Sequence, residues 1–185
     1  VEEFVKTKIA EITDSIFARD AFFGPSEFMT LIHELQLQIS GADISMAAPL
    51  TFDGKIAKGE MTIADMFTLY KYENMLSTLR LTGREIKDYL EYSYSLWIQD
   101  ATDNNYMHLI KYATKKPNHK NNQLKNPSYN FDSAAGINYT VNVTKPYGKR
   151  IAITSLSTGK PFDLDSMYTV AVNSYRAGGG GNHLT

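Results

Sequence analysis

The sequence contains no cysteine among its 185 residues. This absence excludes disulfides, thiolate nucleophiles and thiolate metal ligands. The chain also lacks an excess of positive charge, because 19 basic side chains are balanced by 20 acidic ones. Binding to nucleic acid through its phosphates needs a basic surface, so the composition does not favour a nucleic-acid partner. No apolar run reaches the roughly 18 residues that a membrane-spanning helix requires, so no membrane span is predicted.

Several catalytic motifs are missing as well. No Gly-Lys-Ser/Thr follows the glycine run at 178–181, so this run is not a P-loop, and no Gly-x-Ser-x-Gly marks a serine hydrolase. The four histidines show no metal-ligand spacing, and His33 is predicted to lie on the surface because it falls off the apolar stripe of its helix. His183 is preceded by Gly-Asn as in metallophosphoesterases, but Leu184 replaces the acidic residue of that motif. We therefore expect no catalytic residue, metal or cofactor in this chain.

The remaining composition is that of a folded domain. Hydrophobic residues make up 43% and charged residues 21%, close to the average for globular chains, and the length fits one domain. The chain starts with the acidic stretch 1–3, where a signal peptide would be basic, and it ends abruptly at 184–185. We expect it to be a segment of a longer protein.

Local patterns predict both helices and strands. Ser26 is a suitable N-cap and Gly41 a suitable end for a helix whose apolar face holds Phe28, Leu31, Ile32, Leu35 and Ile39. Thr82 and Glu85 form a capping box before a second helix, which runs to Trp97, and Thr62 caps a short one over 63–70. Strands are predicted over 8–13, 42–50, 75–81, 137–143, 150–156 and 168–173, and loops over 52–60 and 114–128. The mixture predicts an α+β domain with a mixed sheet and packed helices.

The most suggestive surface features are two loop tyrosines. Tyr72 lies beside Asn74 at a predicted turn, and Tyr175 ends a predicted buried strand directly before the four glycines. Flat aromatic faces can stack on a planar ligand, and the amide of Asn74 can bond a base edge. Loop tyrosines also serve simply as packing residues. The glycines fit either a close approach of backbone to a ligand or a mobile chain end.

The order of several segments resembles the C-terminal domain of the 5′-nucleotidase family over roughly residues 20–185. Its tyrosines and the Tyr-Asn-Phe-Asp segment are most similar to the branch that contains 2′,3′-cyclic-nucleotide phosphodiesterase/3′-nucleotidases. The segments that carry the resemblance lie at 41–50, 59–65, 70–76, 81–91, 129–132, 136–139 and 173–180.

This resemblance implies a substrate-binding role. By position, Tyr72 and Tyr175 match two aromatics that hold the nucleoside, Asn74 matches an asparagine at the base, and Gly178, Gly179 and Gly180 match the loop beside the second aromatic. Arg176 is a further candidate for substrate contact. The divalent metal ions and the catalytic residues would belong to an absent N-terminal metallophosphoesterase domain of the same polypeptide. That parent would hydrolyse phosphate esters of nucleosides in the periplasm or at the cell surface, and this chain alone would be inactive.

The sequence departs from the family pattern at two places. Gly181 stands where many members have an aspartate for the ribose, and the stretch 47–53 has no arginine for the phosphate. Ribose recognition and phosphate position are therefore open, and we expect the chain to lack the family's last helix or two. Two alternatives also stay open, a stand-alone nucleoside-binding module and a structural domain that has lost its pocket.

Overall fold

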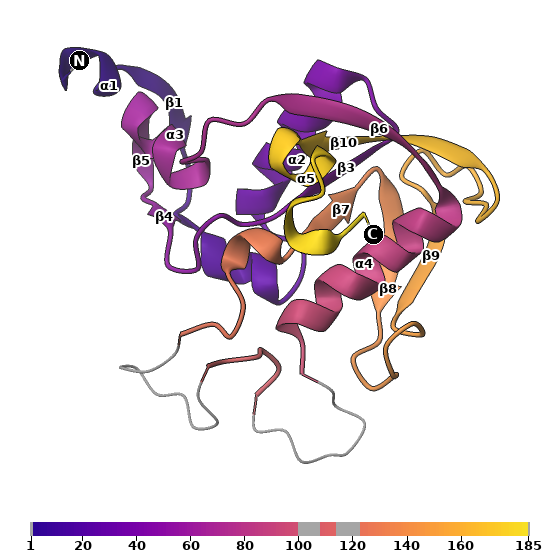
Figure 1. The fold of residues 1–185 in the computed structure, drawn as a ribbon. Helices are drawn as coiled ribbons and strands as arrows, with labels where there is room; N and C mark the ends of the chain where they lie inside the picture. The colour runs from indigo at the N-terminus through magenta and orange to yellow at the C-terminus, as the bar shows by residue number, and fades with distance from the viewer. Residues whose placement is uncertain (1, 100–107, 114–122, 185) are drawn as a thin grey trace.

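The computed structural model describes residues 2–99, 108–113 and 123–184, and its centre is a four-stranded sheet (Figure 1). The strand order is β6 (Leu76–Thr82), β10 (Met167–Asn173), β3 (Ile44–Ala47) and β7 (Ser133–Ala135). β10 runs parallel to β3 and antiparallel to β6, while β7 runs antiparallel to β3. The sheet is therefore mixed, as the sequence predicts.

Two long helices, α2 (Glu27–Ser40) and α4 (Gly83–Trp97), cover opposite faces of this sheet (Figure 1). Successive side chains of a strand point to opposite faces, and β3 shows this clearly. Ile44 and Met46 pack into the apolar cluster around α4, whereas the hydroxyl of Ser45 bonds side chains of α2. All four residues of β3 are buried, so this short strand separates the two halves of the core.

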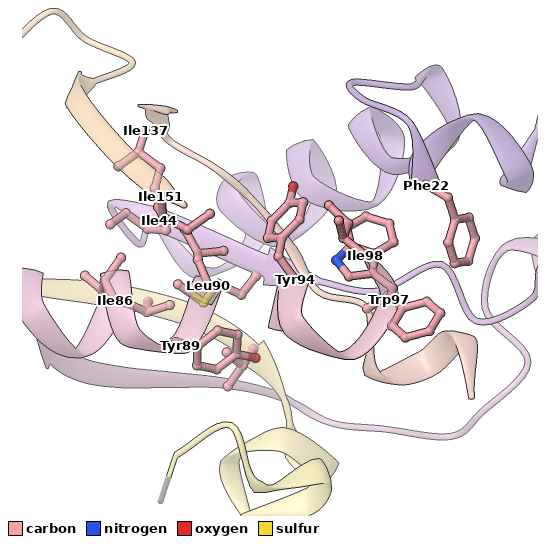
Figure 2. Close-up of a cluster of buried hydrophobic side chains, with 14 of the residues drawn as sticks. Phe22, Ile44, Ile86, Tyr89, Leu90, Tyr94, Trp97, Ile98, Ile137 and Ile151 are labelled. Atoms are coloured by element: carbon pink, nitrogen blue, oxygen red, sulfur yellow. The ribbon is translucent and has the colours of Figure 1, made fainter. Parts of the chain in front are cut away.

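Helix α4 begins where its capping box predicts. The amide of Glu85 donates to Thr82 Oγ1 at 3.2 Å, and the amide of Thr82 donates to Glu85 Oε2 at 2.7 Å. These bonds satisfy two amide donors that a helix start leaves without intrahelical partners. The inward face of the helix then carries Ile86, Tyr89, Leu90, Tyr94 and Trp97 into the core, where Figure 2 shows them beside Phe22, Ile44, Ile98, Ile137 and Ile151.

The remaining elements are short. They are α1 (Glu2–Val5), β1 (Lys8–Ile12), β2 (Ile16–Phe17), η1 (Ala18–Phe22), β4 (Lys55–Ile56), β5 (Gly59–Thr62), α3 (Ile63–Leu69), η2 (Ser128–Asn130), β8 (Ile137–Val141), β9 (Ile151–Leu156), α5 (Ser174–Ala177) and η3 (Gly180–Asn182). The prediction of a loop over 52–60 is partly wrong, because β4 pairs with β2 and β5 pairs with β1. Most of the loop predicted at 114–128 lies outside the described residues. Within the described ranges, no helix has the length and apolarity needed to cross a membrane.

The predicted bounds of α2 are confirmed, but part of its predicted buried face is wrong. Ser26 caps the start and Gly41 ends the helix in the left-handed region at φ 64°. Leu35 and Ile39 are 39% and 72% exposed, although both were expected in the core. His33, which falls outside the predicted apolar stripe, is buried on this helix.

His33 corrects the prediction of a surface histidine, since only 4% of it is exposed. Ser45 Oγ donates its single hydrogen to Gln36 Oε1 at 2.8 Å, so it accepts from His33 Nδ1 at 2.9 Å. His33 Nε2 then accepts from the hydroxyl of Ser133 at 3.1 Å. Burial lowers the pKa of His33 from 6.5 to about 4, although the charge of Asp132 acts in the opposite direction. A neutral imidazole therefore links α2 to β3 and β7.

Candidate functional site

Tyr72 and Asn74 lie in the connection between α3 and β6. The residue Tyr72 is 44% exposed. Asn74 is half-buried, and its Nδ2 donates to the hydroxyl of Tyr70 at 3.1 Å, which fixes the orientation of the amide. No hydrogen bond to Asn74 Oδ1 is found within the described part of the chain, so this oxygen is available as an acceptor.

Tyr175 lies where β10 ends, in the first turn of α5. Asn173 caps that turn, because its Oδ1 accepts from the amide of Arg176 at 2.9 Å. Its Nδ2 donates to Tyr70 at 3.0 Å, and the amide of Ser174 donates to the carbonyl of Met75 at 2.7 Å. These bonds join the two segments that carry the predicted tyrosines. The residue Tyr175 is 44% exposed, like Tyr72.

A third tyrosine connects the two rings. Tyr129 in η2 lies edge-to-face with Tyr72 at a centroid distance of 6.4 Å and with Tyr175 at 6.2 Å, both at an angle of 89°. We call Tyr72, Tyr129 and Tyr175 the tyrosine cluster. Sequence reasoning assigned no role to Tyr129, although it opens the Tyr-Asn-Phe-Asp segment that carries part of the resemblance.

The glycine loop at 178–181 is folded against the tyrosine cluster. Gly179 and Gly181 adopt φ values of 86° and 73°, which favour glycine. Gly180 has another reason, because a Cβ there would lie 2.5 Å from the ring of Tyr175. Gly179, Gly180 and Gly181 are thus explained by the loop's own turns and by the ring that packs on Gly180. Neither expectation from the sequence, a ligand approach or a mobile end, included this packing.

Arg176 was expected to contact substrate, but the structure places its guanidinium beneath the loop with only 3% of the side chain exposed. Its Nε and Nη2 bond the two carboxylate oxygens of Asp132 at 3.0 and 2.7 Å. Nη2 also donates to the carbonyl of Tyr129 at 2.9 Å, and Nη1 donates to the carbonyl of Gly180 at 2.5 Å and to Asn130 Oδ1 at 3.4 Å. The five N–H donors of an arginine are all used, so the expected ligand contact is replaced by contacts within the protein.

Asp132 is the centre of this buried polar group. It is 2% exposed, and besides Arg176 it accepts a short hydrogen bond from the hydroxyl of Tyr89. Burial, followed by the charge of Asp132, raises the pKa of Tyr89 well above its usual range. Burial lowers the pKa of Arg176, but the charge and hydrogen bonds of Asp132 outweigh it and the pKa is raised. The guanidinium stays charged and paired, since a buried charge without a partner is strongly destabilising.

His183 packs on the same group of buried side chains. Its ring contacts the rings of Tyr89 and Tyr92 at 4.8 and 5.0 Å. Nδ1 lies 3.0 Å from the carbonyl of Gly181, and Nε2 lies 3.1 Å from the carbonyl of Asn130. Burial lowers the pKa of His183, against the charge of Asp132. Across residues 2–99, 108–113 and 123–184, no group of three His, Cys, Asp or Glu side chains could hold a metal ion.

Comparison with known proteins gives matches to a family model, to curated proteins and to solved structures. The family model described as "5′-nucleotidase, C-terminal domain" matches residues 8–185. The trifunctional nucleotide phosphoesterase protein YfkN of Bacillus subtilis is 34% identical over 77% of this chain and 10% of its own length. The 2′,3′-cyclic-nucleotide 2′-phosphodiesterase/3′-nucleotidase of Salmonella typhimurium is 30% identical over 74% of this chain and 23% of its own length. The chain thus spans less than a quarter of either curated relative.

The fold matches as well. The solved structure of a Staphylococcus aureus protein assigned as a 5′-nucleotidase, in complex with α-ketoglutarate, superposes with a TM-score of 0.77. The match covers 98% of this chain and 34% of that one at 24% identity, so it concerns the fold alone.

Proposed function

Because the chain belongs to the family of 5′-nucleotidase C-terminal domains, we propose that it binds the nucleoside part of a nucleotide between the rings of Tyr72 and Tyr175. The observation that carries this proposal is the tyrosine cluster, in which Tyr72 and Tyr175 are exposed residues and their rings both contact the ring of Tyr129. Stacking of a base on an aromatic ring contributes about 1–3 kcal/mol. Two exposed rings of this kind supply a binding surface that suits any base.

Asn74 and the glycine loop complete the proposed site. With its Nδ2 bonded to Tyr70, Asn74 offers Oδ1 as an acceptor for an N–H group on the base edge. Gly178, Gly179 and Gly180 follow Tyr175 closely in the chain, and the ring of Tyr175 rests on Gly180. Arg176 supports this loop from below and does not touch the ligand in this arrangement.

The proposal for the parent protein is hydrolysis of a nucleoside phosphate ester. The two curated relatives are named as a nucleotide phosphoesterase and as a cyclic-nucleotide phosphodiesterase/3′-nucleotidase, and both are much longer than this chain. Divalent metal ions in an N-terminal domain of the same polypeptide would activate water and stabilise developing charge. The residues of this chain would bind and orient the nucleoside, a contribution that can amount to several kcal/mol of the barrier. Placement in the periplasm or at the cell surface belongs to the same proposal.

A calorimetric titration of the 185-residue chain with adenosine and AMP, in the presence of a metal chelator, tests the binding role. We expect saturable binding that the double variant Tyr72→Ala/Tyr175→Ala loses. Each stack is worth about 1–3 kcal/mol, so the removal of each ring should weaken binding by about fivefold to about 150-fold.

Tyr147→Ala is the matched control, because this tyrosine is 58% exposed in a turn outside the cluster. It should bind like the wild type. Equal binding by the wild type and the double variant would reject the clamp. If the folded wild type binds neither ligand at millimolar concentration, the structural alternative is favoured. If the full-length protein binds nucleosides but does not hydrolyse nucleotides, the alternative of a nucleoside-binding module is favoured.

A further inference from the structure

The tyrosine cluster is assembled from segments that are distant in sequence and lie at one end of the sheet. Tyr129 belongs to η2, which Figure 1 shows in orange beside the yellow C-terminal loop that holds Tyr175 and Gly180. The two rings touch edge-to-face at 6.2 Å. An edge-to-face contact adds little stability beyond the burial of the two rings, so the ring pair alone is a weak link between the segments. A stronger connection lies below the rings.

That connection is the guanidinium of Arg176. One of its nitrogens, Nη2, donates to the carbonyl of Tyr129, and the other, Nη1, donates to the carbonyl of Gly180. The first carbonyl belongs to the backbone of one cluster tyrosine, and the second belongs to the residue on which the ring of Tyr175 rests. The guanidinium therefore bonds both the backbone of Tyr129 and the backbone of the residue that contacts the ring of Tyr175. Asp132 accepts two further hydrogen bonds from the same guanidinium.

His183 spans the same two segments but is a weaker connection. Both of its ring nitrogens face carbonyl oxygens, those of Gly181 and Asn130, at 3.0 and 3.1 Å. A neutral imidazole has one N–H, so it can donate to only one of these carbonyls at a time. Arg176 carries five donors in a fixed plane and makes its bonds simultaneously.

We propose that Arg176 is a positioning residue that sets the spacing between Tyr129 and Tyr175, and that it does so through the shape of its guanidinium and not through its charge alone. The inference rests on the proposed nucleoside-binding function and adds a determinant of affinity that touches no ligand. A lysine at this position keeps a positive charge opposite Asp132 but cannot reach both carbonyls in one plane. Charge and geometry are therefore separable by one conservative substitution.

The test compares Arg176→Lys with Arg84→Lys. Arg84 pairs with Asp165 at 2.9 Å on the exposed surface, so it provides the same substitution in an arginine–aspartate pair away from the cluster. We expect Arg176→Lys to fold, as reported by fluorescence of the buried Trp97, and to bind adenosine about tenfold more weakly or worse. Its amide resonances at 129–130 and 179–182 should shift, whereas Arg84→Lys should bind adenosine like the wild type with these resonances in place.

Each outcome has a distinct meaning. Wild-type affinity and unchanged loop resonances in a folded Arg176→Lys variant would overturn the positioning role. If the variant loses both stability and affinity, titration is repeated with trimethylamine N-oxide, which favours the compact state. Recovery of full affinity there would reduce Arg176 to a stability residue and also overturn the proposal, whereas persistent weak binding supports it. If the wild type itself does not bind, the proposed function fails, while the resonances at 129–130 and 179–182 still show whether Arg176 holds the two segments.

Discussion

Gly180 shows how a single missing side chain shapes the candidate site. The ring of Tyr175 occupies the space where a Cβ would stand, and no other group lies as close to that position. Tyr175 is an exposed residue, so its ring can turn outward without disturbing the core. The glycine therefore matters for the place of Tyr175 more than for the fold.

We expect Gly180→Ala to displace the ring of Tyr175 and to weaken adenosine binding about tenfold, the effect of losing one stack. The free energy of unfolding should change by less than about 1 kcal/mol, because the displaced group is an exposed side chain. Tyr147→Ala, in a turn outside the cluster, is the control and should keep the wild-type affinity. Isothermal titration and denaturant unfolding of both variants check this, and equal affinities would contradict it.

The sequence predicted some residues of the site better than others. Tyr72, Asn74 and Tyr175 were selected by residue type and by resemblance, and the structure brings the two tyrosines into one cluster. Their binding roles stay predictions. Arg176 was expected at the ligand, and nothing in the local sequence around this arginine indicates that its side chain is buried. Its position depends on Asp132, a partner that no local pattern indicates.

At the scale of elements, helix ends were predictable and helix faces were less so. Caps depend on residues within one turn, which is why the starts at Ser26 and Thr82 and the end at Gly41 are confirmed. The face of α2 depends on what lies opposite. β3 and β7 present the hydroxyls of Ser45 and Ser133 to this helix, and both bond the ring of His33. The pattern of apolar residues alone therefore predicts the wrong buried face for α2.

The buried His33 predicts how acid affects the packing of α2. The pKa of His33 is 6.5 in the unfolded chain and about 4 in the folded protein. Between these two values the unfolded chain therefore binds a proton that the folded chain does not. Above pH 6.5 this group has no effect, and its contribution to stability is lost as the pH falls from 6.5 toward 4. The total loss is about 3 kcal/mol, at about 1.4 kcal/mol per pH unit.

Urea unfolding of the wild type and of His33→Gln, carried out from about pH 7.5 down to about pH 4, measures this contribution. Glutamine cannot titrate, so the variant should lose less stability than the wild type as the pH falls. His183, whose pKa is also lowered by burial, contributes equally to both curves. Parallel curves for the two proteins would show that His33 does not carry the acid sensitivity.

At the scale of the whole molecule, the topology was beyond the reach of local patterns. β10 lies between β6 and β3, although both of those strands are far away in sequence. This arrangement places the connection after α3, the η2 turn and the segment after β10 at one end of the sheet. Tyr129 was assigned no role for this reason, since its proximity to Tyr72 and Tyr175 exists only in the folded chain.

The central claim is that a base lies between Tyr72 and Tyr175 in this chain without help from another domain. The most direct measurement is a set of intermolecular nuclear Overhauser effects between adenosine and the chain, with tyrosine resonances assigned through single Tyr→Phe variants. The account predicts contacts from the base protons H2 and H8 to the rings of both Tyr72 and Tyr175. Contacts to other parts of the surface, or none at millimolar adenosine in a folded sample, would contradict it.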